Sequence, residues 1–181
     1  MHRLNEHADI FARFATLLSY PAPDLKDRAS MLAALLKPIG PPAARALNAF
    51  VQILDAMPPT HMLEHYTRAF DLAPLAVPYL SVYLFGAENP QRGQFMAGFN
   101  AAYADAGHDC QGELPDHLAV VLAYAAVAPE ESWDEVQRLC LPAPLKHMRR
   151  ALEAAGNPYQ HVVTSLEHFV KHVTAGELSH A

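Results

Sequence analysis

Apolar residues recur along nearly the whole chain at intervals of three and four positions, the spacing that places side chains on one face of an α-helix. Prolines and glycines lie between the periodic blocks, where they end helices rather than kink them. The sequence therefore predicts an all-α, single-domain bundle of roughly eight to ten helices. The predicted helical blocks span residues 10–18, 25–36, 47–54, 60–70, 95–106, 118–127, 133–139, 145–155 and 159–173.

Three local features refine this prediction. Thr60 is a good N-cap for the block that follows it. Leu139 is placed on the inward face of its block with Trp133 and Val136. The less regular stretch 71–91 contains "YLSVYLF", which has the composition of a strand but no second strand to pair with, so we predict a short helix there.

The stretch "GELPDHLAVVLAYAA" at 112–126 joins a polar cluster to an almost wholly apolar run. Pro115 suits the first position of a helix, and Asp116 brings a negative charge to the positive end of the helix dipole. The run from 118 to 127 predicts a helix buried on all sides. Capping does not require His117, which is either a buried, hydrogen-bonded histidine or a contact group.

Composition places the chain among globular domains, because 51% of its 181 residues are hydrophobic and 18% are charged. The formal net charge of −6 does not favour nucleic acid as a partner. The N-terminus lacks the apolar core of a signal peptide, and no apolar run is long enough to span a membrane. We therefore expect a cytoplasmic protein without direct membrane insertion, whose helical domain covers residues 1–174 and whose flexible tail covers 175–181.

Two histidine patterns raise the question of a metal site. His61, Glu64 and His65 form H-x-x-E-H, one arrangement of zinc peptidases. These side chains lie opposite an apolar stripe, and a catalytic zinc needs a third ligand in a sheltered cavity. We therefore favour a solvated face over a zinc-dependent hydrolase. A second histidine stripe in the last block also predicts an exposed polar face; its members are His161, His168 and His172.

The chain contains no pattern typical of catalysis. Neither a phosphate-binding loop nor a nucleophile elbow is present, and Cys110 and Cys140 stand apart without a metal-ligand or redox spacing. We expect no enzymatic activity and no cofactor. What remains is an aromatic-rich centre in which "VPYLSVYLFG" offers tyrosines with polar tips, a residue type favoured in peptide-binding grooves.

Three ordered motifs in residues 61–127 carry a family resemblance. They are "YTRAFD" at 66–71, "YLFGAENPQRGQFM" at 83–96 with "AYADAG" after it, and "ELPDHL" at 113–118. Together they resemble the NarJ-type nitrate reductase assembly chaperones, the delta-subunit family, within the wider TorD/DmsD group. Ser81 stands where the TorD-like branch favours an aromatic residue, and Ala119 stands where some relatives have a second proline. These departures favour the NarJ branch.

The resemblance implies a TorD/NarJ-like helical chaperone, a monomer or dimer, without catalytic activity. Its partner would be the N-terminal segment of a molybdopterin-containing catalytic subunit resembling nitrate reductase alpha, held during cofactor insertion before membrane attachment or export. A structural subunit retained in the enzyme complex is the alternative. The motif positions include Gly86 and Gly93, and Asp71 and Asp116 are the acids expected to face arginines of the client. The predicted peptide-binding residues are Tyr66, Phe70, Asp71, Tyr79, Tyr83, Phe85, Arg92, Leu114, Pro115, Asp116 and His117.

Overall fold

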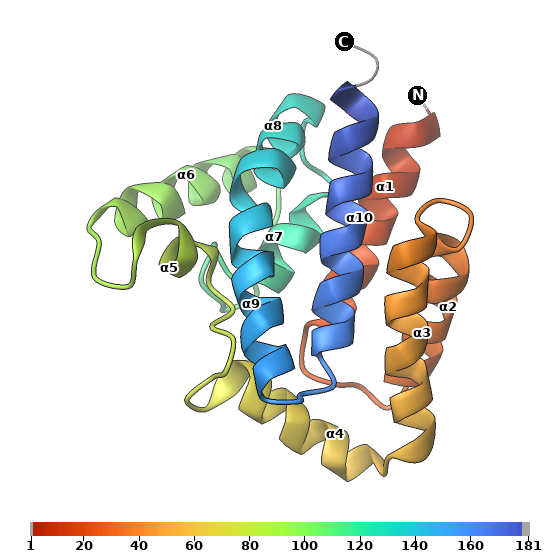
Figure 1. Ribbon diagram of the computed structural model, residues 1–181. Helices are drawn as coiled ribbons and strands as arrows, with labels where there is room; N and C mark the ends of the chain where they lie inside the picture. The colour runs from red at the N-terminus through yellow and green to blue at the C-terminus, as the bar shows by residue number, and fades with distance from the viewer. Residues whose placement is uncertain (1, 179–181) are drawn as a thin grey trace.

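The computed structural model describes the backbone of residues 2–178 and the side chains of residues 7–175. Within that part the chain forms ten α-helices and no β-strand, which confirms the predicted all-α fold (Figure 1). The helices are α1 (His2–Leu17), α2 (Leu25–Leu36), α3 (Pro41–Ala56), α4 (Pro59–Tyr66), α5 (Leu80–Phe85), α6 (Gln91–Ala106), α7 (Leu118–Tyr124), α8 (Glu130–Glu135), α9 (Pro142–Ala154) and α10 (Gln160–Leu178). Two π-helical turns extend α4 and α8, namely η1 (Thr67–Asp71) and η2 (Val136–Cys140).

The bundle is organised around α10, which packs against α3, α9 and α1 (Figure 1). α2 packs on α3, and the short α7 packs on α1. Phe11, Phe14 and Phe169 are fully buried where α1 meets α10, and the ring centroids of Phe11 and Phe169 lie 5.0 Å apart. Each such side chain contributes about 1.5–3 kcal/mol through removal from water, so this aromatic cluster fixes α1 as one wall of the fold.

Several predicted boundaries agree with the structure. α5 is the short helix expected in "YLSVYLF", and it ends at Gly86, whose φ of +90° strains any residue with a side chain. α6 ends at Gly107 in the left-handed conformation. α10 continues to Leu178, so residues 175–178 of the predicted tail are helical, while 179–181 lie outside the described residues.

Two predictions about helix detail are wrong. α4 begins at Pro59 with Pro58 as its N-cap, because proline at the first helical position needs no N–H partner, and Thr60 makes no cap. Leu139 is 65% exposed instead of buried. It lies in η2, and a π-helical turn contains more residues than an α-helical one, so the face predicted from a 3.6-residue period rotates toward solvent.

No helix in the described part of the chain is long and apolar enough to cross a membrane.

Candidate functional site: a groove between the first helix and the ELPDHL motif

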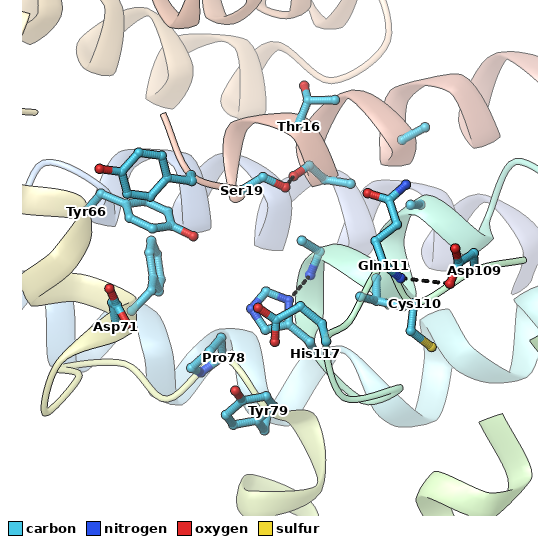
Figure 2. A pocket seen from close by; sticks show the side chains of 18 of the residues that line it. Thr16, Ser19, Tyr66, Asp71, Pro78, Tyr79, Asp109, Cys110, Gln111 and His117 are labelled. Atoms are coloured by element: carbon cyan, nitrogen blue, oxygen red, sulfur yellow. Dashed lines mark hydrogen bonds between the residues drawn. The ribbon is translucent and has the colours of Figure 1, made fainter. Parts of the chain in front are cut away.

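A cavity of about 670 Å³ opens beside the C-terminal half of α1 (Figure 2). Its other walls are η1, the segment 74–79, the loop 108–113 and the first turns of α7. Segments from both halves of the chain therefore build it, and the packing of α7 on α1 holds them together. We call this cavity the groove.

The π-helical turn η1 presents one wall of the groove. Tyr66 ends α4, and its hydroxyl donates a hydrogen bond to the Leu18 carbonyl at the end of α1 (3.4 Å). The Tyr66 ring packs edge-on against Phe70, with centroids 5.4 Å apart. Asp71 follows at the end of η1, exposed at the groove. Backbone bonds from Leu75 and Ala76 return the chain onto η1, which keeps this wall compact.

His117 caps α7, although the sequence analysis assigned the start of this helix to Pro115 and Asp116. Its Nδ1 accepts a hydrogen bond from the Ala119 backbone N–H (3.2 Å), and the helix begins at Leu118. The predictions that Pro115 starts the helix and that Asp116 acts at its dipole are wrong, because both precede the cap. The Pro115 carbonyl instead accepts a hydrogen bond from the buried Tyr103 hydroxyl (2.7 Å).

Asp116 is the centre of a buried polar network. Its side chain is fully buried, and Oδ2 accepts hydrogen bonds from the Ser81 N–H (3.1 Å) and the Ser81 hydroxyl (2.5 Å). Arg92 Nε donates to the same Ser81 oxygen (2.8 Å), which links α6 to α5. The other carboxylate oxygen, Oδ1, is buried and has no partner. This carboxylate holds the structure together from inside instead of facing the groove.

Backbone bonds complete the same junction. The Leu80 N–H donates to the Asp116 carbonyl (3.0 Å), and the Leu118 N–H donates to the Pro78 carbonyl (2.7 Å). An isolated antiparallel bridge pairs Tyr79 with His117, and their rings pack edge-on with centroids 5.6 Å apart. The ELPDHL motif therefore positions Tyr79 and His117, the two residues of this junction that border the groove.

The predicted site residues divide into two groups. Those that line the groove are Tyr66, Phe70, Asp71, Tyr79 and His117. Those that the lining does not include are Tyr83, Phe85, Arg92, Leu114, Pro115 and Asp116. Tyr83 stacks on His147 of α9 instead, with ring centroids 5.9 Å apart, and Phe85 packs on Phe95 of α6. Leu114, 44% exposed, adjoins the lining residue Glu113.

Sequence reasoning missed the contribution of α1 and of the loop before α7. Thr16, Ser19 and Tyr20 line the groove from α1 and its end, and Asp109 and Glu113 line it from the loop. Glu113 is the first residue of the ELPDHL motif, so the motif could have indicated it as a groove residue. Nothing in the periodicity of α1 indicated that its end lies against α7, which follows it by about a hundred residues.

The groove is acidic, and burial shifts the pKa of two of its side chains. Among the described residues that line it, Asp71, Asp109 and Glu113 are acids and none is lysine or arginine. Burial, reinforced by Glu113 and Asp71, raises the pKa of Tyr66 to about 12. Burial lowers the pKa of His117, an effect that the neighbouring charges of Glu113 and Asp116 only partly offset.

The H-x-x-E-H motif was predicted to form a solvated face of its helix. His61 and Glu64 are exposed and His65 is half-buried on α4. Within the described residues, no three His, Cys, Asp or Glu side chains are grouped as metal ligands. In the last helix, His168 and His172 are exposed, as expected, whereas His161 is half-buried.

Comparison with known proteins supplies the family. The family model "Nitrate reductase delta subunit" matches residues 37–165, well over half of the chain. This protein belongs to the nitrate reductase delta subunit family. The match confirms the resemblance to NarJ-type chaperones and extends it beyond residues 61–127. The family is one of assembly chaperones and not of catalysts.

This chain is similar to two kinds of curated protein. It is 33% identical over 135 residues to the nitrate reductase-like protein NarX of Mycobacterium tuberculosis, an alignment that covers 73% of this chain and 20% of NarX. It is 29% identical over 124 residues to the probable nitrate reductase molybdenum cofactor assembly chaperone NarJ of Bacillus subtilis, covering 67% of each chain. The family match includes η1 and α7 of the groove but not α1, whose wall lies outside residues 37–165.

Proposed function

We propose that this delta subunit family member is a dedicated chaperone for the assembly of a molybdenum-containing oxidoreductase of the nitrate reductase type. It acts in the cytoplasm, where its groove holds the N-terminal segment of the catalytic subunit until cofactors are inserted and the enzyme attaches to the membrane or is exported. The observation that carries this proposal is that the "YTRAFD" and "ELPDHL" motifs, whose first residues Tyr66 and Glu113 lie 47 positions apart (113 − 66), meet at one groove.

The surroundings of the groove suit an amphipathic peptide. Four large apolar side chains on the described surface either line the groove or directly follow a lining residue in sequence, and all are exposed: Tyr20 (64%), Leu72 (74%), Leu75 (37%) and Leu114 (44%). Exposed apolar side chains that gather around a cavity are typical of interaction sites. An amphipathic helix that lays its apolar face into such a groove is a common mode of peptide recognition.

The walls of the groove favour the same occupant. On the α1 and α7 sides the lining includes small side chains, among them Ala12, Ala15, Ala119 and Ala123. Small residues leave room for a helix to approach the wall closely. The carboxylates of the lining, Asp71, Asp109 and Glu113, accept hydrogen bonds and attract positive charge. A peptide with one apolar face and basic residues would therefore suit both the small apolar side chains and the carboxylates.

Calorimetry with a synthetic peptide of the cognate catalytic subunit's N-terminal segment tests this proposal. Thr16 is exposed on α1 and lines the groove, so Thr16→Trp fills the groove without disturbing the core. We expect this variant to bind the peptide at least about tenfold more weakly, because the indole occupies volume that the peptide needs. Ser30→Trp, an equal insertion on the exposed face of α2, is the matched control and should bind normally.

Two outcomes would contradict the proposal. One is that the unmodified protein fails to bind any peptide from the N-terminal region. The other is that Thr16→Trp and Ser30→Trp bind equally well. A retained structural subunit is the second candidate, favoured by the description of the family as a delta subunit. Stoichiometric presence of this chain in the purified mature enzyme would support that role over a chaperone's.

A further inference from the structure

The outer side of α9 carries three basic side chains next to one another. Lys146, His147 and Arg150 are all exposed there. Residues three and four positions apart are neighbours on the surface of a helix, so Arg150 lies one turn from both of the others. We call these three residues the basic face. It contrasts with the chain as a whole, whose formal net charge is −6.

The acids near the basic face are already paired. On α9 and α10, the acidic side chains that the structure describes are Glu153 and Glu167. Both form ion pairs with Arg149, at 2.7 Å and 2.6 Å, and Glu167 also pairs with Lys171 at 2.7 Å. α9 packs against α5 and η2 as well, and neither contains an acidic residue. Within the described part of the chain, the basic face therefore has no ion-pair partner.

This arrangement works against the stability of α9. Lys146 and Arg150 are four positions apart, where like charges on a helix repel each other. The exposed positions one turn away on either side are Ala143 and Ala154, where a glutamate would give each cation a partner. A row of cations without an internal partner is complementary to negative charge supplied by another molecule.

The basic face lies close to the groove. Tyr83 of α5 stacks on His147, with ring centroids 5.9 Å apart and an angle of 12° between the rings. α5 begins directly after Tyr79, which lines the groove. Four residues of helix advance about 6 Å, so one turn of α5 separates the groove lining from the contact with α9. A partner held in the groove by one segment therefore has the basic face within reach of its remaining surface.

The composition of this side favours a protein partner over a lipid surface. None of the large apolar side chains exposed on the described surface lies on α9 or α10. A helix that binds a membrane needs an apolar face to insert, and lipid recognition by charge alone uses clusters of roughly four to eight lysines and arginines. The basic face has two and a histidine. A folded protein surface with exposed aspartate and glutamate requires no such insertion.

We propose that the basic face docks an acidic surface on the folded part of the catalytic subunit whose N-terminal segment occupies the groove. The proposal rests on the proposed function, because it assumes the same partner. It concerns a different surface of the chaperone and a different part of that partner. The two contacts reinforce each other, since a tethered partner is present at a high effective concentration and a few exposed ion pairs then suffice.

The test compares two probes on one set of variants by surface-based binding kinetics. The probes are the synthetic N-terminal peptide and the full-length cognate catalytic subunit purified without its cofactors. Lys146→Glu/Arg150→Glu should weaken binding of the subunit about five- to twentyfold, mainly through slower association, and should change binding of the peptide by less than about twofold. Lys146→Gln/Arg150→Gln should give a smaller loss. Added salt should reduce the difference between the unmodified protein and the charge-reversed variant.

A matched control carries the same change in charge elsewhere. Lys37 and Arg45 are exposed, and neither forms an ion pair within the described chain. Lys37 caps the end of α2 and Arg45 lies on α3, which α10 separates from α9 (Figure 1). Lys37→Glu/Arg45→Glu should therefore bind both the peptide and the subunit within about twofold of the unmodified protein.

The outcomes separate the two proposals. If neither probe binds the unmodified protein, the proposed function fails and the basic face fails with it. If only the subunit binds and charge reversal on α9 weakens it, the basic face stands and the groove is not the site for the segment. If both probes bind and the two charge-reversed variants behave alike, the basic face alone is overturned. Binding of the unmodified protein, but not of the α9 variant, to vesicles of phosphatidylglycerol and phosphatidylcholine would overturn the choice of a protein partner.

Discussion

The buried Asp116 carboxylate should be a determinant of stability, and truncating it to alanine provides the clearest test. Oδ2 accepts two hydrogen bonds from Ser81, one from its N–H and one from its hydroxyl. Bonds to a charged group contribute about 1.5–3 kcal/mol each, so losing both costs about 3–6 kcal/mol. Removing the unpartnered Oδ1 returns about 1–2 kcal/mol. We therefore expect Asp116→Ala to lower the free energy of unfolding by about 1–5 kcal/mol.

Urea denaturation measures this loss. Far-UV circular dichroism reports the helices, and fluorescence of Trp133, the single tryptophan, is an independent probe of the core. Asp116→Asn keeps an acceptor for Ser81 and should cost about half as much, which keeps a folded variant measurable if Asp116→Ala does not fold. Asp105→Ala, at an exposed carboxylate on α6, is the control and should change stability by less than about 0.5 kcal/mol.

A double-mutant cycle separates the network from its parts. Ser81→Ala alone should also destabilise, because it removes the acceptor of Arg92 Nε. The double variant Ser81→Ala/Asp116→Ala should cost less than the sum of the single variants by about 1 kcal/mol or more, since both remove the same bond. A loss below about 1 kcal/mol for Asp116→Ala, or full additivity of the two changes, would refute the network as described.

Two further predictions concern the same junction. Because burial lowers the pKa of His117 from its ordinary 6.5, the unfolded chain binds more protons below that pH, so stability should be full above about pH 6.5 and fall as the pH drops toward the folded pKa. Asparagine at this position still accepts the Ala119 N–H but does not titrate, so His117→Asn should flatten the dependence of the urea midpoint on pH. An unchanged pH dependence would assign the loss of stability to other groups, such as His65 and His161, whose pKa values burial also lowers. Tyr103→Phe removes the buried bond to the Pro115 carbonyl and should cost about 1–2 kcal/mol by the same denaturation assay, whereas a neutral result would mean that water replaces the hydroxyl.

Periodicity was sufficient to predict the helices because their stripes are long and regular. The apolar positions in α1, α2, α9 and α10 recur over three or more turns, and that local pattern alone identifies a helix and its buried face. The prediction failed where a π-helical turn changed the period. Leu139 lies in η2 and points outward. The extra residue of a π-helical turn cannot be recognised from apolar residues spaced three and four positions apart.

The composition of the groove depended on the tertiary structure. The ELPDHL motif identified the right region, but the sequence does not indicate in which direction each of its side chains points. Asp116 points inward to Ser81, whereas His117 points to α7 and the cavity. Both side chains are buried, and the positions of α5 and α6 decide that Asp116 is the one that joins the hydrogen-bond network with Ser81 and Arg92.

By itself, the sequence determined the all-helical class, most helix boundaries and the family, since each follows from local spacing or from short ordered motifs. Only the tertiary structure placed the end of α1 with Tyr20 against the loop that carries Glu113, and so made an acidic, tyrosine-rich groove from segments far apart in the chain. The physical reason is that the closing contacts are between distant segments. Their partners are chosen by how whole helices pack, a choice that no short stretch of residues specifies.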